Sequence, residues 1–136
     1  MRCFRLLAWC LALAPASLLA ETVKWRGYDI HYTTFSSTLI PQEVAAAHNI
    51  VRSEYRIVTN VSILKDGEPV KAKVTGRNTN LLNQLFTMEF DEVTEKTAIY
   101  YLANQLIDER DTLRFTINVL PVGETNAFEL KFIRQY

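Results

Sequence analysis

"TLRFTINV", residues 112–119, alternates polar and apolar side chains without a break. Because successive side chains of a β-strand point to opposite faces, this alternation predicts a strand with one apolar and one solvent-facing side. The same period of two occurs in residues 70–77 and 128–132. Further strands, with a less regular alternation, are predicted at residues 23–35, 55–64, 82–90 and 98–106.

Turn signals separate these segments. Asp66-Gly67 is a hairpin signal because Gly accepts a positive φ, and residues 122–126 contain a second turn around Gly123. Residues 92–96 and 108–111 are rich in charge and predict connections. Together the segments predict an all-β fold, an immunoglobulin-like antiparallel β-sandwich of about seven strands.

One segment departs from the β pattern. Residues 41–48 (PQEVAAAH) predict a short helix between the first and second strands. Pro41 suits the first helical position, and Asn49 suits a left-handed residue that ends the helix. The helix either carries function, as insertions often do, or plugs one end of the sandwich.

The first twenty residues have the pattern of a secretory signal peptide. Arg2 and Arg5 precede an apolar run at residues 6–14, and small residues follow. Ala16 and Ala20 are the two candidate positions for cleavage, and we favour Ala20. The apolar run is shorter than the roughly 20 residues of a transmembrane helix.

Removal of residues 1–20 leaves residues 21–136 as a single domain, the β-sandwich. Both cysteines, Cys3 and Cys10, lie in the part removed, so we expect an exported domain without thiol chemistry, in a bacterial periplasm. The chain has 15 basic and 15 acidic residues with no block of one sign. This pattern argues against nucleic acid or an anionic membrane as the main partner, and no later segment predicts an integral membrane span.

The sequence contains few residues in a pattern typical of catalytic sites. His31 and His48 lack metal-ligand spacing, although His31 and Asp29 share a strand face and could converge with His48 in a three-ligand site. The alternative is two ordinary histidines. No nucleophile elbow surrounds Ser37, and no glycine-rich phosphate loop occurs. We therefore expect no enzyme, no catalytic residue, no metal and no cofactor.

Residues 28–41 (YDIHYTTFSSTLIP) and 46–53 (AAHNIVRS) resemble a family of exported proteobacterial proteins, domain of unknown function 4426. Residues 60–65 and 98–101 are also similar to it. Ser36 stands where the family pattern has Asn, and Asn49 stands where Gly is common. The resemblance extends over essentially all of the predicted mature chain. It implies an exported, single-domain β protein of Gram-negative bacteria, and it implies no activity.

The same resemblance nominates a binding surface beside the helical insertion. Its members lie at the end of the first strand and the start of the second: His31, Tyr32, Ser37, Thr38, Arg52 and Ser53. Arg52 is a bidentate donor for a carboxylate or phosphate. If Arg52 pairs with Glu43 or Glu54 instead, it has only a structural role.

These observations favour a non-catalytic protein-binding module of the cell envelope. The expected partner is another envelope protein, bound through an edge strand by strand addition. The alternative is a small-ligand or metal-binding periplasmic domain, and the third possibility is a hydrolase. The sequence leaves the oligomeric state and the ligand open.

Overall fold

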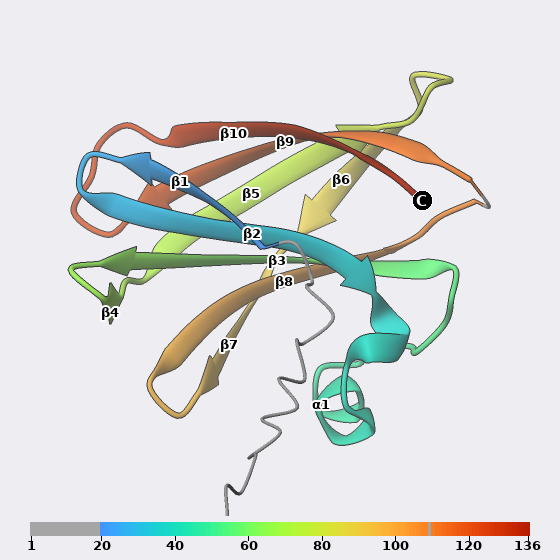
Figure 1. Cartoon of the computed structure of the whole chain (residues 1–136), viewed down its shortest axis with the longest axis horizontal. Coiled ribbons are helices and arrows are strands. Elements are labelled where there is room, and N and C mark those ends of the chain that lie inside the picture. Colours follow the sequence, from blue (N-terminus) through green and yellow to red (C-terminus); the bar gives the residue numbers. More distant parts are fainter. Residues whose placement is uncertain (1–19, 109) are drawn as a thin grey trace, which may run out of the picture.

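The computed structural model describes residues 20–108 and 110–136. The predicted signal peptide at residues 1–20, with Cys3 and Cys10, therefore lies outside the described residues except for Ala20. The described chain forms ten strands, one 3-10 turn and one α-helix (Figure 1). The elements are β1 (Glu21–Trp25), β2 (Tyr28–Ser36), η1 (Ser37–Leu39), α1 (Gln42–Ala47), β3 (Arg56–Lys65), β4 (Glu68–Pro69), β5 (Ala72–Thr79), β6 (Leu85–Glu89), β7 (Asp91–Glu95), β8 (Ala98–Leu106), β9 (Thr112–Pro121) and β10 (Phe128–Gln135).

The strands form two antiparallel sheets. A six-stranded sheet has the order β1-β2-β3-β8-β7, with β4 paired to β3, and a four-stranded sheet has the order β10-β9-β5-β6. The all-β sandwich predicted from the alternation is confirmed. The strand count is higher than the seven expected from the sequence.

The segment 23–35 is two strands rather than one. Arg26 and Gly27 have φ values of 49° and 82°, which turn the chain between β1 and β2. Two successive residues with positive φ make the tight hairpin that suits twisted strands. Arg-Gly lacks the Asn or Asp that usually announces such a turn. As a consequence, the helix lies between β2 and β3, not between the first and second strands.

The charged segment 92–96 was expected to be a connection, but most of it forms β7. The chain leaves β6 in one sheet and enters β7 in the other within a single residue, Phe90. Val93 is the one buried side chain of β7, and its neighbours are exposed. An edge strand tolerates this many charges because they discourage pairing with other chains.

Helix α1 packs against a part of the outer face of the six-stranded sheet, near the end of β2 (Figure 1), and its side chains form a core separate from the one between the sheets. Ile40, Ala45 and Ile50 pack around Val58 of β3 in a small second core. Pro41 caps the helix instead of occupying its first turn. Asn49 has a φ of 54°, so the left-handed end predicted for the helix is confirmed.

The main core lies between the two sheets. The six-stranded sheet contributes alternate side chains of β2 and β3, and the four-stranded sheet contributes those of β9 and β10. The rings of Phe115 and Phe132 stack at a centroid distance of 4.6 Å. The alternate residues of segments 112–119 and 128–132 that were predicted to face the core do so. The buried side chains are Leu113, Phe115, Ile117, Val119, Leu130 and Phe132.

Candidate functional site

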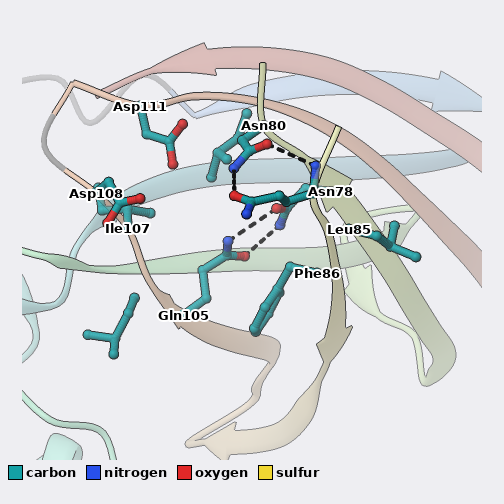
Figure 2. A pocket seen from close by; sticks show the side chains of 11 residues that line it. Asn78, Asn80, Leu85, Phe86, Gln105, Ile107, Asp108 and Asp111 are labelled. Atoms are coloured by element: carbon teal, nitrogen blue, oxygen red, sulfur yellow. Dashed lines mark hydrogen bonds between the residues drawn. The ribbon is translucent and has the colours of Figure 1, made fainter. Parts of the chain in front are cut away.

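A polar pocket of about 240 Å³ lies at one end of the sandwich, between the β5–β6 hairpin and the connection from β8 to β9 (Figure 2). Residues between 78 and 86 supply one wall, and residues 105–108, 111 and 113 supply the other. In Figure 2, Asp108 and Asp111 lie on the side of the β8–β9 connection, while Asn78 and Asn80 lie on the side of the hairpin. The pocket is therefore lined by strands of both sheets.

Two buried amides bridge the sheets in this pocket. Asn78 Nδ2 donates to Gln105 Oε1 at 2.5 Å, and Gln105 Nε2 donates to Asn78 Oδ1 at 3.1 Å. The two side chains are only 2% and 6% exposed. Both residues occupy inward positions of their strands, where the alternation would place apolar side chains. Reciprocal pairing satisfies groups that would otherwise be costly to bury.

Two carboxylates border the same pocket. Asp111 Oδ1 accepts a hydrogen bond from the backbone N–H of Thr112 at 3.0 Å. Within the described part of the chain, neither Asp108 nor Asp111 forms an ion pair with a lysine or arginine. The pocket therefore presents oxygen acceptors to solvent, and it suits a cationic or hydrogen-bond-donating group.

The β5–β6 hairpin tip beside the pocket is held by one side chain. Asn80 Oδ1 accepts hydrogen bonds from the backbone N–H groups of Leu82 at 3.0 Å and Gln84 at 2.9 Å. Asn80 Nδ2 donates to Gln84 Oε1 at 2.7 Å, and Asn83 adopts a φ of 59°. An Asn that bonds the backbone two and four residues on fixes the turn locally.

This fixed turn presents apolar side chains to solvent. Leu81, Leu82 and Leu85 are 63%, 79% and 63% exposed. Phe86 and, across the pocket, Leu106 are also exposed. Several exposed apolar side chains close to a polar pocket are typical of surfaces that bind other proteins. We call this group the leucine rim.

Strand β6 is also an edge of its sheet. It pairs with β5 on one side, and no described strand pairs with its other side. Its exposed residues include Leu85, Phe86 and Thr87, and its only charged residue is Glu89. Natural edge strands are protected by shortness, charged side chains, proline or a bulge, and of these β6 has its length of five residues and one charge, Glu89, but no lysine, proline or bulge.

The structure brings together four of the six residues nominated from the sequence. Ser37 Oγ lies 2.8 Å from the Val51 carbonyl and 3.0 Å from the Ser53 carbonyl, and it accepts from Ser53 N at 2.9 Å. Arg52 Nη2 donates to the Thr38 carbonyl at 2.8 Å rather than pairing with Glu43 or Glu54. Ser37 is completely buried, so its hydroxyl ties two loops together.

The other two nominated residues lie elsewhere. His31 is near the middle of β2, about 20 Å along the strand from Ser37 at ~3.3 Å per residue. A hydrogen bond of 2.7 Å joins His31 Nδ1 to Thr22 Oγ1 of β1. The residues that the structure describes contain no group of three His, Cys, Asp or Glu that could hold a metal ion, so Asp29, His31 and His48 are not assembled.

Tyr32 points into the core, where its ring lies 4.7 Å from that of Phe132. Its hydroxyl donates to Glu21 Oε2 at 2.5 Å, and Arg134 Nη2 donates to Glu21 Oε1 at 2.6 Å. Burial, together with the Glu21 carboxylate, raises the pKa of the Tyr32 hydroxyl. The hydrogen bond from Tyr32 and the Arg134 charge lower the pKa of Glu21. This trio ties β1 and β2 to β10.

Comparison with known proteins identifies the fold and the family. The model of a domain of unknown function, DUF4426, matches residues 23–136. A crystal structure of a DUF4426 family protein from Pseudomonas aeruginosa is 37% identical, covers 86% of this chain and 94% of that chain, and has a TM-score of 0.80. No curated protein matches the chain in sequence.

Two more distant structures share the fold. A copper-bound variant of FetP from uropathogenic Escherichia coli has a TM-score of 0.64 at 10% identity, and covers 85% of this chain and 93% of that chain. FetP as isolated after expression in the E. coli periplasm has a TM-score of 0.63 at 10% identity, covering 85% and 92%. None of the helices in residues 20–108 and 110–136 has the length and apolar character needed to cross a membrane. The chain belongs to the DUF4426 family.

Proposed function

We propose that the chain is an exported, periplasmic protein-binding module, and that it binds an extended segment of another envelope protein along β6. The observation that carries this proposal is the leucine rim, which lies beside an edge strand with a single charged residue. The start of β1 at Glu21, directly after the favoured cleavage position Ala20, supports export.

Strand addition uses backbone groups that the edge leaves free. Alternate residues of β6 direct their N–H and C=O groups away from β5, and an added strand would satisfy them. Leu85 and Phe86 project to opposite faces, so each face offers one apolar contact to the partner. Because Asn80 already fixes the hairpin, binding costs little ordering of the loop.

The polar pocket favours a partner that carries a positively charged side chain. Asp108 and Asp111 border it across from Asn80 (Figure 2), and Leu85, Phe86 and Leu106 of the leucine rim also line it. A lysine or arginine of the partner that entered the pocket would meet carboxylate and amide oxygens while leucines excluded water. Contacts that surrounding residues shield from water often contribute most of the binding energy of an interface.

Site-specific cross-linking tests the proposal in cells of the source organism. A photo-reactive amino acid replaces Leu82 in one strain and Val122 in another. Val122 is a matched control because it is 70% exposed in the hairpin at the opposite end of β9. We expect one envelope protein to be captured from position 82 and not from position 122, and Leu85→Lys to abolish the capture. Equal capture from both positions, or none from either, would contradict the proposal.

A metal-binding function is the second candidate from the sequence, and the likeness to FetP supports it only weakly. Fold similarity at 10% identity transfers no ligand set to particular residues. We therefore assign the function to the β6 edge and the leucine rim.

A further inference from the structure

The outer face of the four-stranded sheet carries a group of cations around one threonine. Thr116 of β9 is paired with Arg77 of β5 on one side and with Lys131 of β10 on the other. Arg114 lies two residues before Thr116 on the same face, paired with Thr79. Neighbouring strands lie about 4.8 Å apart, so three long cationic side chains are within reach of one point above Thr116.

A hollow of about 650 Å³ lies over this group. Among the residues that the structure describes, its lining includes Arg77, Arg114 and Lys131 with Thr79 and Thr116, and it includes no Asp or Glu. Ile133, which is exposed, forms an apolar border. In the described part of the chain no helix lies over this sheet, whereas α1 packs against a part of the outer face of the other sheet (Figure 1).

The cations of the hollow are incompletely neutralised. Lys131 Nζ lies 3.1 Å from Glu129 Oε1, in a pair that is exposed on both sides. Within residues 20–108 and 110–136, Arg77 and Arg114 form no ion pair. Glu129 and Glu89 belong to the next row of the sheet and do not line the hollow. The local charge of the hollow is therefore positive although the whole chain is neutral.

We propose that this hollow binds a phosphate group. Two guanidinium groups can each donate two parallel hydrogen bonds to phosphate oxygens, and the lysine and threonine hydroxyls add single donors. A phosphate dianion uses such a donor set more fully than a carboxylate does. The apolar border at Ile133 would contact the remainder of the molecule that carries the phosphate. The hollow is formed by β5, β9 and β10 and lies next to β6, whose Leu85 and Thr87 pair with Thr79 and Arg77, but phosphate binding there does not depend on the function proposed above.

The test is a titration of the isotopically labelled chain with sodium phosphate, followed by the amide signals of Thr79, Thr116 and Lys131. Sodium chloride at equal ionic strength is the reference. Because exposed charge pairs are individually weak, we expect saturable shifts with a dissociation constant in the millimolar range. The paired substitution Arg77→Gln and Arg114→Gln should weaken binding at least about tenfold, the factor expected from the loss of two charge-assisted contacts.

The matched control is Lys24→Gln with Lys96→Gln. It removes the same charge from the other sheet, and it should leave the dissociation constant within about twofold, since screening confines exposed charges to a Debye length. Absence of saturable shifts overturns the proposal, as does equal weakening by the control pair. Thermal unfolding of both variants verifies that they are folded.

A second arm identifies the source of the phosphate. Vesicles of phosphatidylglycerol and of phosphatidylcholine are sedimented with the chain. Retention by phosphatidylglycerol alone, lost in the Arg77 and Arg114 variant, assigns the phosphate to a lipid headgroup. Saturable binding of free phosphate without retention by either vesicle assigns it to a soluble phosphorylated molecule. Either result supports the site, whereas retention that the variant does not reduce contradicts it.

Discussion

Asn78 and Gln105 exchange two hydrogen bonds across the sandwich, at 2.5 Å and 3.1 Å, from strands in different sheets. They form the polar end of an otherwise apolar interior, and they line the pocket together with Phe86 (Figure 2) and Leu113. Each amide is the main polar partner of the other. The stability of this end of the molecule and the shape of the pocket therefore depend on both residues together.

Replacing one member of this pair should cost more than replacing both. Asn78→Leu leaves the Gln105 amide buried without its partner, and we expect the free energy of unfolding to fall by about 1–3 kcal/mol. The double variant Asn78→Leu with Gln105→Met removes both polar groups and should recover part of that loss. Urea unfolding of the single and double variants measures the coupling. Additive effects would show that the two amides act independently.

Gly76 permits a close approach of the β6–β7 connection to β5. A Cβ atom at this position would lie 3.2 Å from Ile117 Cγ1, 3.2 Å from the Thr116 carbonyl oxygen and 3.3 Å from Phe90 Cε2. Gly76→Ala should therefore lower the free energy of unfolding by about 1–3 kcal/mol through overpacking. Phe90→Leu in the same chain should relieve only part of the loss, because the contact with backbone remains. An Ala variant as stable as the parent would contradict this account.

Acidification should weaken the link between β1 and β10. The hydrogen bond from Tyr32 and the charge of Arg134 lower the pKa of Glu21 in the folded chain. The carboxylate therefore stabilises the fold at neutral pH, and this contribution is lost as the pH falls below about 4.5, the ordinary pKa of a glutamate. In thermal scans from pH 7 to pH 3, Glu21→Gln should show a smaller loss of stability than the parent. The exposed Glu95→Gln should follow the parent curve.

The sequence predicted the parts of the fold that alternation controls. The buried faces of β5, β9 and β10 follow directly from a period of two, because each strand has one side in the core. The β1–β2 hairpin was missed because Arg26-Gly27 is an uncommon turn pair. Strand β7 was missed because its charges belong to an edge and not to a connection.

The candidate site was harder to predict. Asn78 and Gln105 could have been recognised in the sequence, since both are polar residues at inward positions of otherwise apolar strand faces. Nothing in the order of residues, however, indicates that the chain from 78 to 86 meets the chain from 105 to 113. The solvent exposure of Leu81 and Leu82 also depends on where β5 ends, which local composition does not determine.

Ser37 should prove to be a structural residue. Its buried hydroxyl joins η1 to the loop before β3 through Val51 and Ser53, so Ser37→Ala should lower the free energy of unfolding by about 1–3 kcal/mol. Arg52→Ala removes one exposed hydrogen bond and should cost less than about 1 kcal/mol. Urea unfolding of both variants provides the comparison. A Ser37→Ala variant with full stability would leave the serine free for a binding role.

A double variant with alanine at His31 and Arg52 tests whether the partner binds the surface nominated from the sequence or the leucine rim. Both side chains are at least partly exposed and make one side-chain hydrogen bond each, so the double variant should fold. If β6 and the rim bind the partner, cross-linking from position 82 should persist in this variant, because His31 and Arg52 lie on other elements. Loss of the cross-link with unchanged thermal stability would instead place the binding surface among the residues nominated from the sequence, at His31, at Arg52 or at both.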